Sequence, residues 1–92
     1  RITVAEPVEG ADRVLRLEVE LGKETRQIIA GIAEFYEPEA LIGKMIVVVS
    51  NLEPRTIRGL ESNGMLLAAK KKKKLTLVTL DDDDFPSGAE VS

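Results

Sequence analysis

Basic side chains are the groups of this sequence whose type and spacing could do chemistry. Arg55 and Arg58 lie three positions apart in the middle of the chain, and residues 70–74 are five consecutive lysines. A guanidinium group can bind phosphate through two parallel hydrogen bonds, whereas an ammonium group binds it as a point charge. Together with Lys44, these residues are candidate phosphate ligands.

The chemistry that the sequence lacks is equally informative. It contains no cysteine and no histidine, which excludes Ser-His and Cys-His nucleophiles and the usual zinc sites. The four aspartates at residues 81–84 lack the spacing and central glycine of an EF-hand loop, so we interpret them as a solvated run. Acid–base chemistry by carboxylates, lysine chemistry and oxygen-ligated metals remain open, so an enzyme is disfavoured, and we predict an accessory binding protein with no catalytic residue, no metal and no cofactor.

Length and composition indicate one ordinary globular domain. The 92 residues are 43% hydrophobic and 32% charged, and the longest apolar run, residues 45–49, is far too short to span a membrane. We expect no membrane partner, and the absence of cysteine fits a cytoplasmic protein. The net charge of −3 is unusual for a nucleic-acid binder. However, the charges are segregated along the chain, so the local field can differ from the total.

Strands must position these basic residues, because most of the chain alternates between apolar and polar positions. The alternation is clearest over residues 15–21, LRLEVEL, which is typical of a half-buried strand. A connection is predicted over residues 7–10. The other predicted strands cover residues 2–5, 25–30, 45–49, 65–69 and 75–80.

One short helix is predicted over residues 37–43. Pro38 suits the first helical turn, the flanking acids suit a helix N-terminus, and Gly43 suits the end. Three strands, a helix and further strands is the order of an oligonucleotide/oligosaccharide-binding (OB) barrel. We therefore predict an all-β, five-stranded OB-fold barrel with one short helix between strands three and four. Other small barrels fit the strand spacing nearly as well but usually lack the helix.

Residues 51–69, NLEPRTIRGLESNGMLLAA, closely resemble the signature of the tRNA-binding domain that is appended to methionyl-tRNA synthetases. The same module occurs as a free-standing tRNA-binding protein and in the endothelial monocyte-activating polypeptide group. Residues 8–22, 25–44 and 45–52 agree with the family in order and spacing. The resemblance implies an OB barrel without enzyme activity that binds tRNA largely by shape and often forms a homodimer. The implied partners are tRNA and a synthetase catalytic domain or subunit, reached in cis or in trans.

The resemblance also ranks the candidate site residues. It favours tRNA contacts by Arg55 and Arg58, with Lys44 as a further phosphate donor. Arg16 and Arg26 lie on candidate exposed strand faces, and we interpret them as ordinary surface residues. The remaining candidates each keep a structural alternative: turn chemistry for Asn51 and Ser62, core packing for Met65, and a solvated surface for Lys70, Lys71 and Lys72.

Two departures from the family pattern limit what the resemblance implies. The acidic and aromatic lead-in to the first strand is missing, so we expect residues 1–92 to form a single domain that lacks the start of this strand. The lysine run replaces a turn that often contains glycine and acidic residues, which predicts an unusual hairpin tip. The alternative function is a dimeric protein-interaction or export-chaperone-like OB module.

Overall fold

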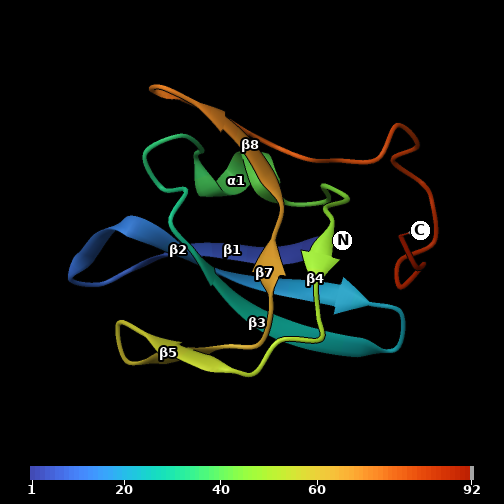
Figure 1. Cartoon of the computed structure of the whole chain (residues 1–92), viewed down its shortest axis with the longest axis horizontal. Helices are drawn as coiled ribbons and strands as arrows, with labels where there is room; N and C mark the ends of the chain where they lie inside the picture. The colour runs from blue at the N-terminus through green and yellow to red at the C-terminus, as the bar shows by residue number, and fades with distance from the viewer. Residues whose placement is uncertain (92) are drawn as a thin grey trace.

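The computed structural model describes residues 1–91, and its first three strands form an antiparallel sheet in the order β1-β2-β3 (Figure 1). They are β1 (Ile2–Val8), β2 (Ala11–Leu21) and β3 (Glu24–Ala30). The predicted strands are confirmed, but the predicted connection over residues 7–10 is wrong in length. β1 continues through Val8, and the turn needs only Glu9 and Gly10, because Gly10 adopts the left-handed conformation, with φ 78°.

The predicted helix is present as a single turn, α1 (Pro38–Leu41). Pro38 occupies its first turn, and Leu41 points into the core with no exposed surface. The helix stops before the predicted residue 43 because Ile42 is already extended. Gly43 then reverses the chain with φ 88°.

The second half of the chain consists of short strands in antiparallel pairs rather than two long ones. The pairs are β4 (Val48–Val49) with β7 (Met65–Leu66), β5 (Arg55–Ile57) with β6 (Leu60–Ser62), and β8 (Ala68–Lys71) with β9 (Lys74–Leu77). The predicted strand over residues 45–49 is shorter than expected because its partner changes: Ile46 bridges Thr79, and only β4 pairs with β7. The predicted strand over residues 75–80 is likewise shorter in the structure, where β9 ends at Leu77. The β5–β6 hairpin is an additional element that the sequence pattern does not predict.

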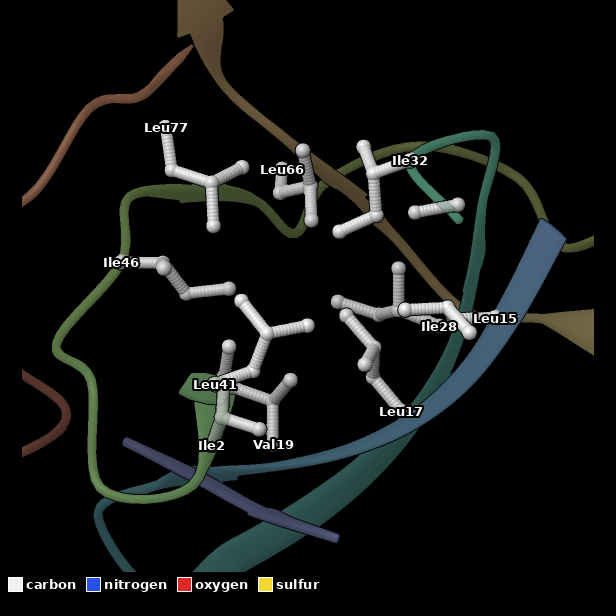
Figure 2. Packing of buried hydrophobic residues seen from close by; sticks show 11 residues of the cluster. Ile2, Leu15, Leu17, Val19, Ile28, Ile32, Leu41, Ile46, Leu66 and Leu77 are labelled. Carbon is white, nitrogen blue, oxygen red and sulfur yellow. The ribbon is translucent and has the colours of Figure 1, made fainter. Parts of the chain in front are cut away.

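Apolar side chains from β1, β2, β3, α1, β7 and β9, and from the connections at Ile32 and Ile46, meet in one core (Figure 2). Leu15, Leu17 and Val19 are the large buried side chains of β2, which confirms the predicted alternation. Burial of such side chains stabilises the fold by about 25 cal/mol per Å² of apolar surface. The remaining members of the cluster are Ile2, Ile28, Ala30, Ile32, Leu41, Ile46, Leu66 and Leu77.

The C-terminal segment is fastened to the turn between β2 and β3. The Ser87 hydroxyl accepts a hydrogen bond from the Gly22 amide at 3.3 Å and donates one to the Glu20 carboxylate at 3.0 Å. A side chain at Gly88 would begin 2.7 Å from the Gly22 nitrogen, so the two backbones can approach only because residue 88 is glycine. This segment helps to border an open hollow of about 1010 Å³, which also reaches β4.

Across residues 1–91, no helix has both the length and the apolar character needed to cross a membrane.

Candidate nucleic-acid interface

The β5–β6 hairpin carries both arginines that the sequence singles out, and we name it the arginine hairpin (residues 55–62). Ile57 pairs with Leu60, so the turn consists of Arg58 and Gly59 alone. Both turn residues have positive φ, 53° and 79°, the pattern of a type I′ turn that matches the twist of the flanking strands. The turn therefore places the exposed Arg58 at the tip of a twisted ribbon.

Arg58 occupies this position at a conformational cost. The left-handed region costs an ordinary L-residue about 1–2 kcal/mol, and type I′ turns favour Asn, Asp and Gly instead. Sites at which such strain persists are often functional. The open space around Gly59 shows that the turn is not tightly packed.

Three side chains fasten the arginine hairpin to β3. The Ser62 hydroxyl accepts a hydrogen bond from the Ile29 amide at 3.0 Å, and the Gln27 side-chain amide donates to the Glu61 carbonyl at 2.8 Å. Arg26 donates to two carbonyl groups, those of Ser50 and Asn63, at 2.6 and 3.1 Å. The hairpin is thus fixed at its base, although it projects from the body of the fold (Figure 1).

Five of the six arginines fall into two electrostatic classes, and the sixth, Arg1, is half-buried and donates to the Gly43 carbonyl at 3.4 Å. Three of them are neutralised locally: Arg13 pairs with Glu34, Arg16 with Glu6 and Glu18, and Arg26 with Glu24. The hydrogen bond to Glu18 is the largest cause that raises the pKa of Arg16. Within residues 1–91, Arg55 and Arg58 have no acidic partner within 4 Å, and both are exposed. Their positive charges are therefore available to an anionic ligand.

The other three candidates from the signature segment occupy different environments. Asn51 is exposed and borders the large hollow, whereas Met65 is half-buried in β7 opposite Val49. Ser62 is only 3% exposed, and its hydroxyl also donates to the Gly64 carbonyl at 3.1 Å. Both hydrogen-bonding directions of this hydroxyl are used inside the protein, which favours the structural alternative for Ser62.

Lys44 is half-buried and follows the turn that ends α1. Burial raises the pKa of Tyr36. Three other effects together lower this pKa below its ordinary value: the hydrogen bond from the Leu77 amide, a hydrogen bond with the Thr76 side chain, and the positive charge of Lys44. Lys44 lies between α1 and β4, where its carbonyl accepts a hydrogen bond from the Ile2 amide at 2.9 Å, whereas Leu77 belongs to β9, which pairs with β8 in a second hairpin. We name this ribbon, which contains Lys70, Lys71 and Lys72, the lysine hairpin (residues 68–77).

The structure therefore divides the candidates into two groups. Asn51, Arg55, Arg58, Ser62 and Met65 belong to the arginine hairpin and the segments next to it. The lysine hairpin, with Lys70, Lys71 and Lys72, lies at the opposite edge of the molecule in Figure 1, and Lys44 lies outside both groups, between α1 and β4. The sequence pattern gives no sign that Arg26 and Gln27 position the arginine hairpin. The only local signal of that hairpin was Gly59 after Arg58, between short alternating segments.

Among residues 1–91, no group of three or more acidic side chains is placed to hold a metal ion.

Comparison with known proteins extends these observations to a family. The family model described as "Putative tRNA binding domain" matches residues 1–90. The chain is 53% identical over 92 residues to a methionine–tRNA ligase of Thermotoga maritima and 48% identical over 91 residues to that of Caldanaerobacter subterraneus subsp. tengcongensis. These alignments cover 100% and 99% of the chain but 14% of either ligase. The chain is therefore similar to an accessory domain of these ligases.

Solved structures confirm the fold. A methionyl-tRNA synthetase-related protein from Pyrococcus horikoshii superimposes with a TM-score of 0.91 at 36% identity, covering 99% of this chain and 84% of that one. The chaperone CsaA from Bacillus anthracis gives 0.89 at 30% identity, with the same coverages. The predicted all-β class with one short helix is confirmed, as is the family predicted from residues 51–69. This chain belongs to the tRNA-binding domain family.

Proposed function

We propose that this domain binds folded tRNA through the arginine hairpin and so raises the tRNA affinity of an aminoacyl-tRNA synthetase, most simply a methionyl one, in cis or in trans. The observation that carries the proposal is the pair of exposed arginines without acidic partners, on a hairpin fixed at its base. Contacts of arginine with phosphate supply affinity without reading sequence. Identity of 48–53% to ligase domains supports the synthetase context.

Recognition of tRNA shape suits the limited aromatic content of this surface. The whole chain has three aromatic residues, and none of them lies in the arginine hairpin. Single-stranded nucleic acids are usually held by stacking of bases on aromatic rings. A folded RNA instead presents phosphates in a fixed arrangement that rigidly held arginines can match. The proposed ligand is therefore tRNA in its folded state, and the proposed location is the cytoplasm.

A binding assay with folded tRNA tests this proposal. The 92-residue chain should bind folded tRNA more tightly than an unstructured RNA of the same length and charge, because only the folded form presents the phosphate arrangement. Replacing Arg58 by Gln should weaken binding more than the charge-matched change Lys23→Gln in the exposed turn between β2 and β3. Equal affinity for folded and unstructured RNA would contradict shape recognition, and equal effects of the two substitutions would contradict the assigned face.

The synthetase role needs its own measurement. Addition of the domain to a methionyl-tRNA synthetase that lacks one should lower the KM for tRNA and leave the KM for methionine unchanged, because the domain contacts only the RNA. If the KM for tRNA is unchanged both when the domain is fused to the synthetase and when it is added separately, the proposed synthetase function is wrong, although the domain can still bind RNA.

The second candidate is a dimeric protein-interaction or chaperone-like module. The specific observation in its favour is the 30% identity and TM-score of 0.89 to the Bacillus anthracis chaperone CsaA. The open hollow also exposes Phe85 and Val91, which are 43% and 72% exposed and could form part of a homodimer contact or a peptide site. Peptide binding without measurable tRNA affinity at low salt would favour this candidate, and sedimentation equilibrium would measure the dimer.

A further inference from the structure

The lysine hairpin concentrates five exposed positive charges on one ordered ribbon. Lys71 pairs with Lys74, so Lys72 and Lys73 alone form the turn. None of the lysines of residues 70–74 takes part in an ion pair or a side-chain hydrogen bond with another residue of the described chain. These charges are therefore held together without any local neutralisation.

This arrangement costs stability in two ways. Lys71 and Lys74 are directly opposite each other, and like charges at opposed positions of an antiparallel pair are destabilising. Lys72 has φ 57°, in the left-handed region that ordinary side chains disfavour. An anion bound at the tip would relieve the first of these costs, because it would neutralise the opposed charges.

The base of the ribbon is fixed to the body of the domain. The Leu77 amide donates a hydrogen bond to the Tyr36 hydroxyl at 3.1 Å, and the Leu77 side chain is 5% exposed. The Val78 amide continues the ladder with a bond to the Leu67 carbonyl at 3.1 Å. The five charges consequently occupy a defined place on the fold, which distinguishes them from charges on a flexible tail.

Figure 1 shows the lysine hairpin at the upper edge of the molecule and the arginine hairpin at the lower edge, with the three-stranded sheet between them. The described chain measures 34 × 27 × 22 Å along its principal axes. Charge interactions across solvent are screened over about 8 Å at physiological ionic strength. The run holds five of the thirteen basic residues, which leaves eight basic residues against sixteen acidic ones elsewhere. The two hairpins are therefore separate cationic points on an otherwise acidic domain.

We propose that the lysine hairpin is a second phosphate-binding surface for the RNA that the arginine hairpin holds, so that the domain contacts two separate backbone segments of one folded RNA. This inference rests on the proposed function, since it needs the first contact at the arginine hairpin. Joining two contacts makes the second binding event intramolecular, which can raise affinity by about 10²–10⁴ over either contact alone. A ligand must then present phosphates at both edges of the domain, which selects folded RNA over short or flexible strands.

An anionic membrane is the main competing ligand for a lysine-rich tip. Leu67 and Val78, which are 42% and 40% exposed, lie at the base of the hairpin and add apolar surface. RNA is favoured because the arginine hairpin offers a second unneutralised cationic point on a different edge, which a flat lipid surface would not contact at the same time. Vesicle binding is therefore included as an outcome of the test.

The test compares three proteins with two RNA probes. The proteins are the wild-type chain, the neutralised variant K71Q/K72Q/K73Q/K74Q and the charge-conserving variant K71R/K72R/K73R/K74R, with thermal melting to verify that each is folded. The probes are an intact folded tRNA and one isolated stem-loop arm of it. For intact tRNA, the neutralised variant should bind at least about tenfold more weakly at low salt, and its log–log salt slope should fall by about 0.7–0.9 for each phosphate that the lysines no longer bind. The charge-conserving variant should bind intact tRNA with wild-type affinity.

The isolated arm distinguishes a second direct contact from a long-range electrostatic attraction of the RNA to the lysines. An arm that reaches only one hairpin can use the arginine hairpin alone, so the neutralised variant should bind it within about twofold of wild type. Equal decreases in affinity for the arm and the intact tRNA would overturn the inference in favour of long-range attraction. Loss of binding in the charge-conserving variant would also overturn it, because phosphate contact by charge would be retained there.

The remaining outcomes separate this inference from the proposed function. If the neutralised variant binds intact tRNA like wild type whereas R55Q/R58Q does not, the second contact is wrong and the proposed function stands. If neither variant loses affinity, the arginine face is wrong as well. Lysine-dependent binding to vesicles of phosphatidylserine and phosphatidylcholine, with unchanged tRNA affinity, would assign the hairpin to a membrane surface instead.

Discussion

The hydroxyl group of Ser62 accepts a hydrogen bond from the backbone amide of Ile29 at 3.0 Å, and this contact joins the arginine hairpin to the central sheet. The two residues are 33 positions apart in the chain. Because Ser62 is 3% exposed, no water can easily replace its hydroxyl.

Ser62→Ala should destabilise the fold by about 1–3 kcal/mol, since it leaves a buried amide without an acceptor. Urea unfolding followed by circular dichroism measures this change. The matched control is Ser50→Ala at an exposed serine, which should change stability by less than about 0.5 kcal/mol. A stable Ser62→Ala protein with impaired tRNA binding would instead show that the hydroxyl contacts the RNA.

Arg58→Asn should stabilise the domain and weaken tRNA binding at the same time. Asn tolerates the left-handed conformation of a type I′ turn better than Arg, so the free energy of unfolding should rise by about 0.5–1 kcal/mol. The RNA affinity should fall because the guanidinium at the tip is removed. Arg55→Asn is the control, because it removes the same charge from a β5 residue that does not have a positive φ and therefore carries no such strain. A similar gain in stability for Arg55→Asn would contradict the assignment of strain to Arg58.

Tyr36→Phe should loosen the base of the lysine hairpin. The substitution keeps the ring but removes the acceptor of the Leu77 amide, at a cost of about 1–3 kcal/mol. In native-state hydrogen exchange, the Leu77 amide should exchange faster in the variant than in the wild type. The Ile29 amide, whose acceptor is Ser62, should exchange at the wild-type rate. Unchanged protection at Leu77 would mean that the hydroxyl does not anchor this hairpin.

Gly88→Ala should detach the C-terminal segment from the turn between β2 and β3. The new Cβ would lie 2.7 Å from the Gly22 nitrogen and 2.8 Å from its Cα, which forces backbone to move. Gly10→Ala provides the control, because Gly10 has a similar φ of 78° with no atom within 4 Å of the added Cβ. Hydrogen exchange at Gly22 should accelerate in the first variant only. Equal acceleration in both variants would assign the effect to φ strain alone.

The sequence was sufficient for the parts of the fold that repeat a simple physical pattern. Leu15, Leu17 and Val19 of β2 face the core at every second position, and Pro38 begins the helix. The arginine hairpin was missed because strands of three residues contain too little alternation to stand out. Arg58 followed by Gly59 was the available turn signal.

The residues that position the site could not be predicted from local pattern. Arg26 reaches carbonyl groups 24 and 37 positions away, and such long-range hydrogen bonds leave no periodic signal. The separation of the lysine run from the arginines likewise depends on how the two hairpins are placed on the sheet. Sequence identified the candidate basic residues, whereas the structure divided them between two surfaces.

The central claim is that the exposed arginines of the β5–β6 hairpin contact RNA phosphates, and the salt dependence of tRNA binding tests it most directly. Dissociation constants of the wild-type chain and of R55Q/R58Q should be measured over a range of salt concentrations, with thermal melting to verify folding. If each arginine contacts one phosphate, the log–log slope of the double variant should be smaller by about 1.4–1.8, from about 0.7–0.9 for each phosphate bound. Equal slopes and equal affinities for the two folded proteins would contradict the claim.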